Sequence, residues 1–150
     1  MLYRAIAALF LLFAIPYSAV MASSPSLTLI MPRGVQRGHE HVLTFSGARL
    51  NDAEEIFFYT KGVTAKKIEA VNANSIKVTV EVAADCRLGE HIAQVRTRSG
   101  VSDFRSFFVG AFPQVDEKEQ NGSVEEAQAV ELNVTVAGVV ASEDVDYYVV

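Results

Sequence analysis

The strictest pattern in this chain is the alternation from Ile76 to Val82, where every second residue is apolar and β-branched. The residues between them are Lys77, Thr79 and Glu81, all polar. A period of two is typical of a β-strand with one face in a core and the other in water. The pattern therefore predicts a half-buried strand and constrains the fold of the sequence around it.

Short apolar stretches separated by turn residues surround this strand. The predicted strands cover residues 27–31, 40–46, 56–59, 63–71, 76–82, 91–98 and 102–109. The stretch at 56–59 is apolar on both faces, which predicts a central strand, and Gly47 is expected to end the strand before it. Short strands with turns about every 8–12 residues predict an all-β fold, an Ig-like β-sandwich.

The first 22 residues have a different composition, with 19 apolar residues and a single charge at Arg4. The apolar run at residues 5–15 would span about 16 Å as a helix, well short of a bilayer core of about 30 Å. We therefore predict a signal peptide over residues 1–22, and an uncleaved N-terminal anchor is the alternative. No membrane span is expected in the mature chain, which would be periplasmic, at the cell surface or extracellular.

Charge and cysteine content exclude several classes of function. Beyond residue 22 the chain has 12 Lys and Arg against 18 Asp and Glu, a net charge of −6. Nucleic-acid binding needs a basic face, so no nucleic-acid partner is expected. One cysteine, Cys86, excludes a disulfide framework and a cysteine-based zinc site.

The composition changes after residue 110. Residues 111–116 are predicted to be a linker, and residues 117–150 a second, incomplete β-module. Residues 123–130 are expected to form one or two helical turns, because Ser123 and Glu126 have the spacing of a capping box. About 34 residues bury too little apolar surface to fold alone, so this tail is expected to be disordered, to dock on the sandwich or to belong to a longer chain.

Residues 25–110 carry motifs placed as in one type of Ig-like domain. These motifs are Pro32-x-Gly34-x-x-x-Gly38, Leu43-Thr44-Phe45-Ser46-Gly47, Leu88-Gly89-Glu90-His91 leading into Val95, and Gly100-Val101-Ser102 followed by Phe107. This segment resembles the IPT/TIG family. The resemblance implies an extracellular or receptor-type binding and spacer domain with no shared active site.

The tail has two motifs of its own. They are Glu117-Lys118-Glu119-Gln120-Asn121-Gly122 and, beyond Gly138, Asp144-Val145-Asp146-Tyr147-Tyr148. This pair resembles the start of the bacterial pre-peptidase C-terminal (PPC) domain, although Gln120 replaces a usual proline and Gly122 replaces an oxygen-bearing side chain. The succession of signal, Ig-like domain and PPC start resembles large exported proteins of planctomycete-type bacteria.

The acidic residues of these two motifs are the best candidate site. Carboxylate and amide oxygens are the ligands that Ca²⁺ prefers, and several are needed. In PPC-like collagen-binding domains of clostridial collagenases, the matching positions hold calcium. The resemblance therefore implies a Ca²⁺ cofactor bound by Glu117, Glu119, Asn121, Asp144 and Asp146. The alternative is a solvated acidic linker and a polar turn.

Other chemistry has weaker support. His39 and His41 are two residues apart on a predicted strand, whereas the helical zinc motif needs a spacing of four. Cys86 is interpreted as a small buried hydrophobe rather than a reactive thiol. The aromatic residues at 57–59 and 104–108 are assigned mostly to the core, although an outward-facing Phe would mark a contact surface.

No nucleophile elbow, phosphate loop or dinucleotide fingerprint is present, so we expect no enzyme activity. The leading hypothesis is a non-catalytic exported binding, adhesion or spacer module of a cell-surface or periplasmic protein, with an extracellular protein or polysaccharide as its partner. The alternative is the N-terminal accessory part of a secreted peptidase or other hydrolase, with its catalytic domain outside this chain.

Overall fold

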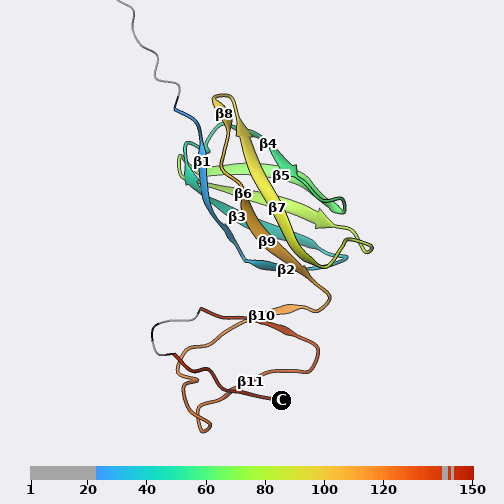
Figure 1. The fold of residues 1–150 in the computed structure, drawn as a ribbon, viewed down its shortest axis with the longest axis vertical. Helices are drawn as coiled ribbons and strands as arrows, with labels where there is room; N and C mark the ends of the chain where they lie inside the picture. The colour runs from blue at the N-terminus through green and yellow to red at the C-terminus, as the bar shows by residue number, and fades with distance from the viewer. Residues whose placement is uncertain (1–22, 140–141, 143) are drawn as a thin grey trace, which may run out of the picture.

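The computed structural model describes residues 23–139, 142 and 144–150, so the predicted signal peptide at residues 1–22 lies outside the described residues. Their regular secondary structure consists of β-strands joined by turns and loops, with no helix. A β-sandwich comes first along the chain and a smaller set of short strands follows it (Figure 1). The all-β prediction is confirmed. No helix in the described part of the chain is long and apolar enough to cross a membrane.

Two sheets form the sandwich. The first contains, in order, β1 (Ser26–Met31), β3 (Glu40–Ala48), β6 (Ser75–Val82) and β5 (Val63–Asn72). The second contains, in order, β2 (Gly34–Gln36), β9 (Arg105–Gly110), β7 (Gly89–Thr97) and β4 (Ala53–Phe58), and β8 (Gly100–Val101) pairs with β7. Apart from β2, which runs parallel to β9, these orders correspond to those of a constant-type immunoglobulin sandwich.

The strand with the strict alternation, β6, lies between β3 and β5 and has its apolar face in the core. Ile76, Val78 and Val80 are 0% exposed, whereas Lys77 and Glu81 are exposed. Leu43 and Phe45 of β3 face the same core. Burial of these side chains removes apolar surface from water and drives the two sheets together.

Several strand predictions were wrong in detail. The short β2 was missed, since three residues carry no usable period. β4 is an edge strand and not a central one: Ile56 faces the core, but Phe57 pairs with Gln94 on the outer face. Gly47 does not end β3 but lies inside it, opposite Leu27 of β1.

The strands beyond Gly110 form two separate two-stranded sheets. β10 (Gln114–Asp116) pairs in parallel with β12 (Thr135–Ala137), and β11 (Gln128–Ala129) pairs in parallel with β13 (Tyr148–Val149). β10 therefore falls within the predicted linker. The expected helical turns at 123–130 were wrong: the Glu126 amide donates to the Ser123 carbonyl in a turn, and β11 follows.

Apolar burial separates the two parts of the chain. All the buried core residues lie between Leu27 and Val109. Among the described residues beyond Gly110 the only buried one is Asn121, and Leu132, Val139 and Val150 are each more than 70% exposed. The sandwich therefore has a hydrophobic core, whereas the described tail is held by backbone pairing and polar contacts.

Close packing at Gly47 gives the first prediction. A Cβ at Gly47 would lie 1.9 Å from the Ser26 carbonyl oxygen of β1, so Gly47→Ala must push β1 away from β3. We expect the free energy of unfolding to fall by about 1–3 kcal/mol, the usual cost of overpacking. Urea unfolding measures it. Gly110→Ala is the control, since its Cβ would meet nothing closer than 3.6 Å. Equal midpoints for the two variants would contradict the prediction.

Candidate functional site

The predicted calcium ligands lie in the smaller set of strands. Glu117 follows β10, and its amide donates to the Ala137 carbonyl at the end of β12. Asn121 is joined to the last strand, because its carbonyl accepts from the Tyr147 amide at 2.9 Å. Backbone pairing thus brings residues 117–121 close to residues 144–148.

Glu117 is the centre of this cluster. Its Oε2 accepts from the Val139 amide at 2.9 Å, and its Oε1 accepts from Asn121 Nδ2 at 3.2 Å and from the Tyr148 hydroxyl. The Tyr148 hydrogen bond, followed by that of Val139, lowers the pKa of Glu117 below its usual value. The same Glu117 carboxylate raises the pKa of Tyr148 to about 12. Glu117 is thus the ionised acceptor that ties three segments of the tail together.

Asp146 has the opposite environment. Its Oδ1 is buried and has no hydrogen-bond partner. Burial raises its pKa first, and the charges of Asp144, Glu117 and Glu119 raise it further. An oxygen of this kind, desolvated and close to like charges, is stabilised by a proton or by a cation.

The cluster fits a cation only in part. Asn121 is 2% exposed and its amide already donates to Glu117, while the Glu119 side chain is exposed. Within the described residues, no group of three or more His, Cys, Asp or Glu is placed to hold a metal ion. The calcium assignment to these five residues stays a prediction, with Asp146 Oδ1 as the oxygen that best fits it.

The histidines have structural contacts. His41 Nε2 lies 2.8 Å from the Gln36 carbonyl oxygen of β2. His91 is 1% exposed, and its Nε2 lies 2.7 Å from the Arg87 carbonyl oxygen. Cys86 is buried in the hydrophobic core, and burial raises the pKa of its thiol, which disfavours the reactive thiolate. These environments agree with a structural role for all three.

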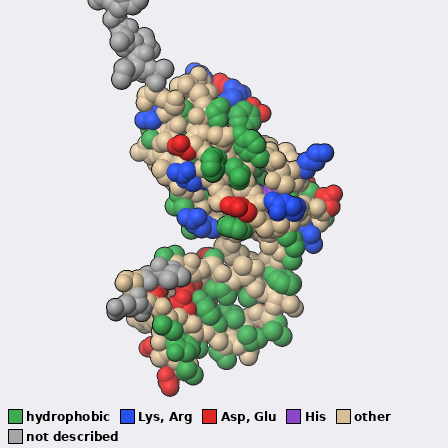
Figure 2. All heavy atoms as spheres, viewed as in Figure 1, with side chains coloured by type: hydrophobic (Ala, Val, Ile, Leu, Met, Phe, Trp, Pro, Cys, Tyr) green, Lys and Arg blue, Asp and Glu red, His purple; other side chains and the backbone are tan. Residues whose placement is uncertain are grey.

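The assignment of the aromatic residues at 57–59 and 104–108 mostly to the core was wrong, because only Phe107 among them is buried and Tyr59, Phe104 and Phe108 are exposed. An aromatic surface lies instead on the outer face of the second sheet. Its members are Phe57 and Tyr59 near the end of β4, Ile92 on β7, and Phe104 before β9; we call them the aromatic surface. Tyr59 and Phe104 are 64% and 62% exposed. Figure 2 shows apolar side chains gathered on this face of the sandwich.

The aromatic surface contains a shallow hollow of about 280 Å³, lined by Tyr59, Ile92, Gln94 and Phe104. The Tyr59 hydroxyl donates to Gln94 Oε1, and Gln94 Nε2 donates to the Ser102 carbonyl at 2.6 Å. Strand parity was the signal that identifies this surface. Ile92 alternates with the buried His91 and Ala93, so its side chain must point outward.

Comparisons with known proteins add little. No protein-family model matches the chain, and no curated protein matches it. One similar solved structure is the twitchin kinase region of C. elegans, at 12% identity and a TM-score of 0.32, covering 57% of this chain and 15% of that one. Another is a mutant of the SrpA adhesin of Streptococcus sanguinis, at 15% identity and a TM-score of 0.33, covering 58% of this chain and 57% of that one. Values this low do not establish a shared family or function.

The environment of Asp146 gives a prediction about pH. Because its folded pKa is raised, its contribution favours the fold below the ordinary aspartate pKa and is lost as the pH rises through the folded pKa. Asp146→Asn removes the repelled charge. We therefore expect it to slow amide exchange of Gln128 and Val130, which donate to carbonyls at residues 147 and 149, at pH 7. The difference in exchange rate between the variant and the original chain should vanish in strong acid, where Asp146 is itself protonated.

The measurement is amide hydrogen exchange of variant and original chain at matched pH, followed by NMR. Asp103→Asn, an exposed aspartate of the sandwich, is the control and should change neither amide. Faster exchange at pH 7 in the Asp146→Asn chain would show that the charge of Asp146 stabilises the tail instead.

Proposed function

We propose that this chain is a non-catalytic, exported binding module that contacts an extracellular protein or a polysaccharide through the aromatic surface. The observation that supports the proposal is the exposure of Tyr59 and Phe104 on one sheet face. Apolar residues gathered on a soluble domain's surface are typical of interaction sites. Aromatic rings contribute most of the contact energy in many such sites.

The hydrogen bonds around Gln94 support a binding role for the aromatic surface, because they order one of its exposed rings. Gln94 accepts a hydrogen bond from the Tyr59 hydroxyl and donates one to the Ser102 carbonyl, so the ring of Tyr59 is ordered before a partner binds. A side chain that is already ordered loses less conformational entropy on binding. Tyr59 therefore has the properties of a preorganised anchor.

The hollow between the two rings indicates the class of partner. It is shallow and about 280 Å³ in volume, with Tyr59, Phe104 and Ile92 presenting apolar faces around the Gln94 amide. Such a surface suits a sugar ring or a projecting apolar side chain, which pack against an aromatic face. The net charge of −5 for the whole chain makes nucleic acid a poor partner.

Calcium would stabilise the tail in this proposal. A Ca²⁺ ion at Asp146, with Asp144 and Glu119 as further oxygen donors and Glu117 and Asn121 beside them, would replace the repulsion among these carboxylates by attraction. Its role would be structural, since a bound ion stabilises the folded state by mass action.

Binding is tested with the purified full chain on arrays of polysaccharides and extracellular proteins. We expect binding that falls at least about tenfold in a Tyr59→Ala, Phe104→Ala double variant, because each aromatic anchor contributes about 1–2 kcal/mol. The control is Val42→Ala with Val71→Ala, two exposed apolar residues of the first sheet. Unchanged binding by the double variant, or no binding by the original chain, would overturn the proposal.

The calcium role is tested by calorimetry and thermal melting. Millimolar Ca²⁺ should raise the melting temperature of the tail, magnesium should raise it less, and the Asp146→Asn chain should not respond. A chain whose melting is unaffected by millimolar Ca²⁺ has no calcium site of this kind.

A further inference from the structure

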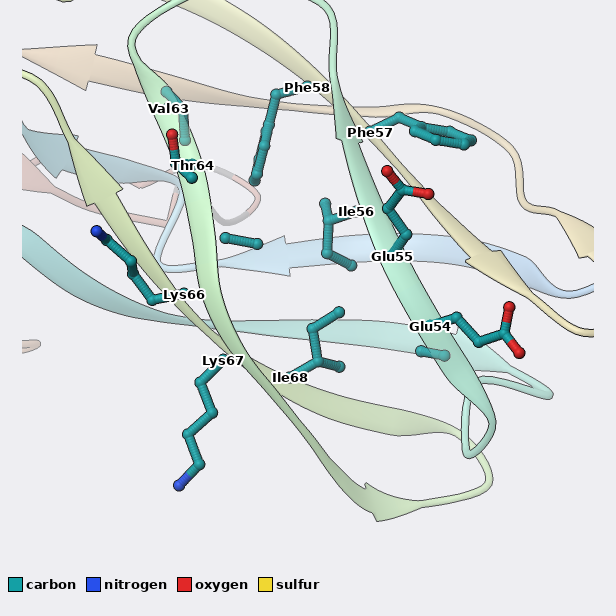
Figure 3. A pocket seen from close by; sticks show the side chains of 12 residues that line it. Glu54, Glu55, Ile56, Phe57, Phe58, Val63, Thr64, Lys66, Lys67 and Ile68 are labelled. Atoms are coloured by element: carbon teal, nitrogen blue, oxygen red, sulfur yellow. The ribbon is translucent and has the colours of Figure 1, made fainter.

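A groove lies between β4 and β5, and its lining includes no residue of the calcium cluster and neither Tyr59 nor Phe104 of the aromatic surface. It measures about 710 Å³ and runs between the two strands where the sheets part. β4 ends the second sheet and β5 ends the first, so two strand edges border one groove. Figure 3 shows Ile56, Phe58 and Ile68 pointing into the space between the strands, and Phe57 pointing away from it.

The floor of this groove is an exposed part of the hydrophobic core. Among the apolar residues that pack against the core but stay partly exposed are Ala53, Phe58, Ala65 and Ile68, and all four line the groove. The Phe58 ring meets the buried Phe107 edge to face, with ring centres 6.0 Å apart. The core is therefore incompletely covered along this seam, and an apolar occupant would complete it.

The β4 backbone has hydrogen-bonding groups that face the groove. Val95 lies opposite Ile56, yet its carbonyl accepts from the Ser102 amide and its amide donates to Ser102 Oγ, both at 2.9 Å. Both groups of Val95 thus point away from β4. In an antiparallel pair such partners do not bond each other, so the amide and carbonyl of Ile56 point to the free edge.

The same holds two residues further along. The Tyr59 amide donates to the Ile92 carbonyl, so the backbone groups of Tyr59 point to β7. Because backbone groups alternate along a strand, the amide and carbonyl of its neighbour Phe58 point to the groove. Ile56 and Phe58 together present donors and acceptors that repeat at about 6.8 Å, the two-residue repeat of a strand. Another extended backbone offers matching groups at that spacing.

The facing edge of β5 is less suited to pairing. Its register with β6 shifts between Ala65 and Lys67, which marks a bulge in the middle of the groove wall. A bulge interrupts the regular row of backbone groups and is a usual protection of an edge strand. β4 also has a register shift, between Ala53 and Glu55, but its pairing with β7 is regular from Glu55 to Phe58. An added strand would therefore pair with this part of β4 and pack its side chains against β5.

The charges around the groove are already paired. Arg96 contacts Glu54 and Glu55 on the β4 side. On the β5 side Lys66 pairs with Glu81, and Lys67 lies 2.9 Å from Glu69. Because each of these charges has a partner on the protein, the groove favours a neutral occupant over a charged one.

We propose that the groove between β4 and β5 binds an extended, uncharged polypeptide strand of a partner protein, which adds to the second sheet beside β4. Its backbone pairs with Ile56 and Phe58, and every second side chain packs onto Ala65 and Ile68. Main-chain hydrogen bonds would supply affinity and the alternate side chains would supply specificity. Phe57 of the aromatic surface borders this groove, but its side chain points away from it, and the proposed pairing uses neither Tyr59 nor Phe104.

The test uses a fluorescein-labelled peptide of alternating valine and threonine, about six residues long, the usual length of a strand. We expect saturable binding to the purified full chain by fluorescence anisotropy. Two further peptides carry N-methyl groups on the valine nitrogens or on the threonine nitrogens. One of them should bind at least about tenfold more weakly, because it loses its hydrogen bonds to β4. Methylation at valine has this effect if the pairing is antiparallel.

Two variants of the protein complete the test. Ala65→Arg places a long side chain in the groove and should abolish peptide binding, whereas Ala70→Arg makes the same change on an exposed part of β5 and should not. Thermal melting verifies that both variants fold. The proposal is overturned if the peptide fails to bind, if neither methylated peptide binds more weakly, or if the two variants behave alike.

A second copy of the chain is the competing occupant. Analytical ultracentrifugation decides between the two. A chain that dimerises and whose dimer is lost on Ala65→Arg would pair β4 with β4 of another copy, and the proposal of a separate partner strand would be wrong. A chain that stays monomeric while binding the peptide supports the proposal.

Discussion

Burial of the alternating face of β6 is the interaction on which the rest of the structure depends. Ile76, Val78 and Val80 are fully buried, and β3 and β5 pair with the two edges of this strand. The second sheet must then cover this apolar face, which places Val95 and Phe107 against it. Because the sheet faces meet over a single core, every surface feature of the sandwich takes its position from this contact.

The same contact leaves two regions in which apolar groups meet water. The sheets part between β4 and β5, where Ile56 and Phe58 line a groove and present an unpaired backbone. On the outer face of the second sheet, Tyr59 and Phe104 stand out from the strands. One region offers backbone pairing and the other offers aromatic faces, so the two suit partners of different chemistry.

The tail follows a different principle. Its described residues bury no apolar side chain, and its order rests on the Glu117 carboxylate, which accepts from Val139, Asn121 and Tyr148. Such polar networks contribute little net stability when they are exposed to water. The Asp146 carboxyl nearby, whose pKa is raised by burial and by neighbouring carboxylates, makes the tail sensitive to protonation and, in our proposal, to calcium.

The sequence alone determined the parts that depend on local pattern. Alternation determined the buried face of β6, because a period of two leaves a strand only one way to face a core. The resemblance of the acidic motifs implied that Glu117 and Asp146 belong to one calcium site, and that site stays a prediction. Only the tertiary structure decided which strands are edges. Ile56 and Phe57 are both apolar and adjacent in the sequence, yet Ile56 faces the core and Phe57 faces the solvent. Long-range pairing makes that choice, and with it the positions of the groove, the aromatic surface and the cluster of carboxylates around Asp146.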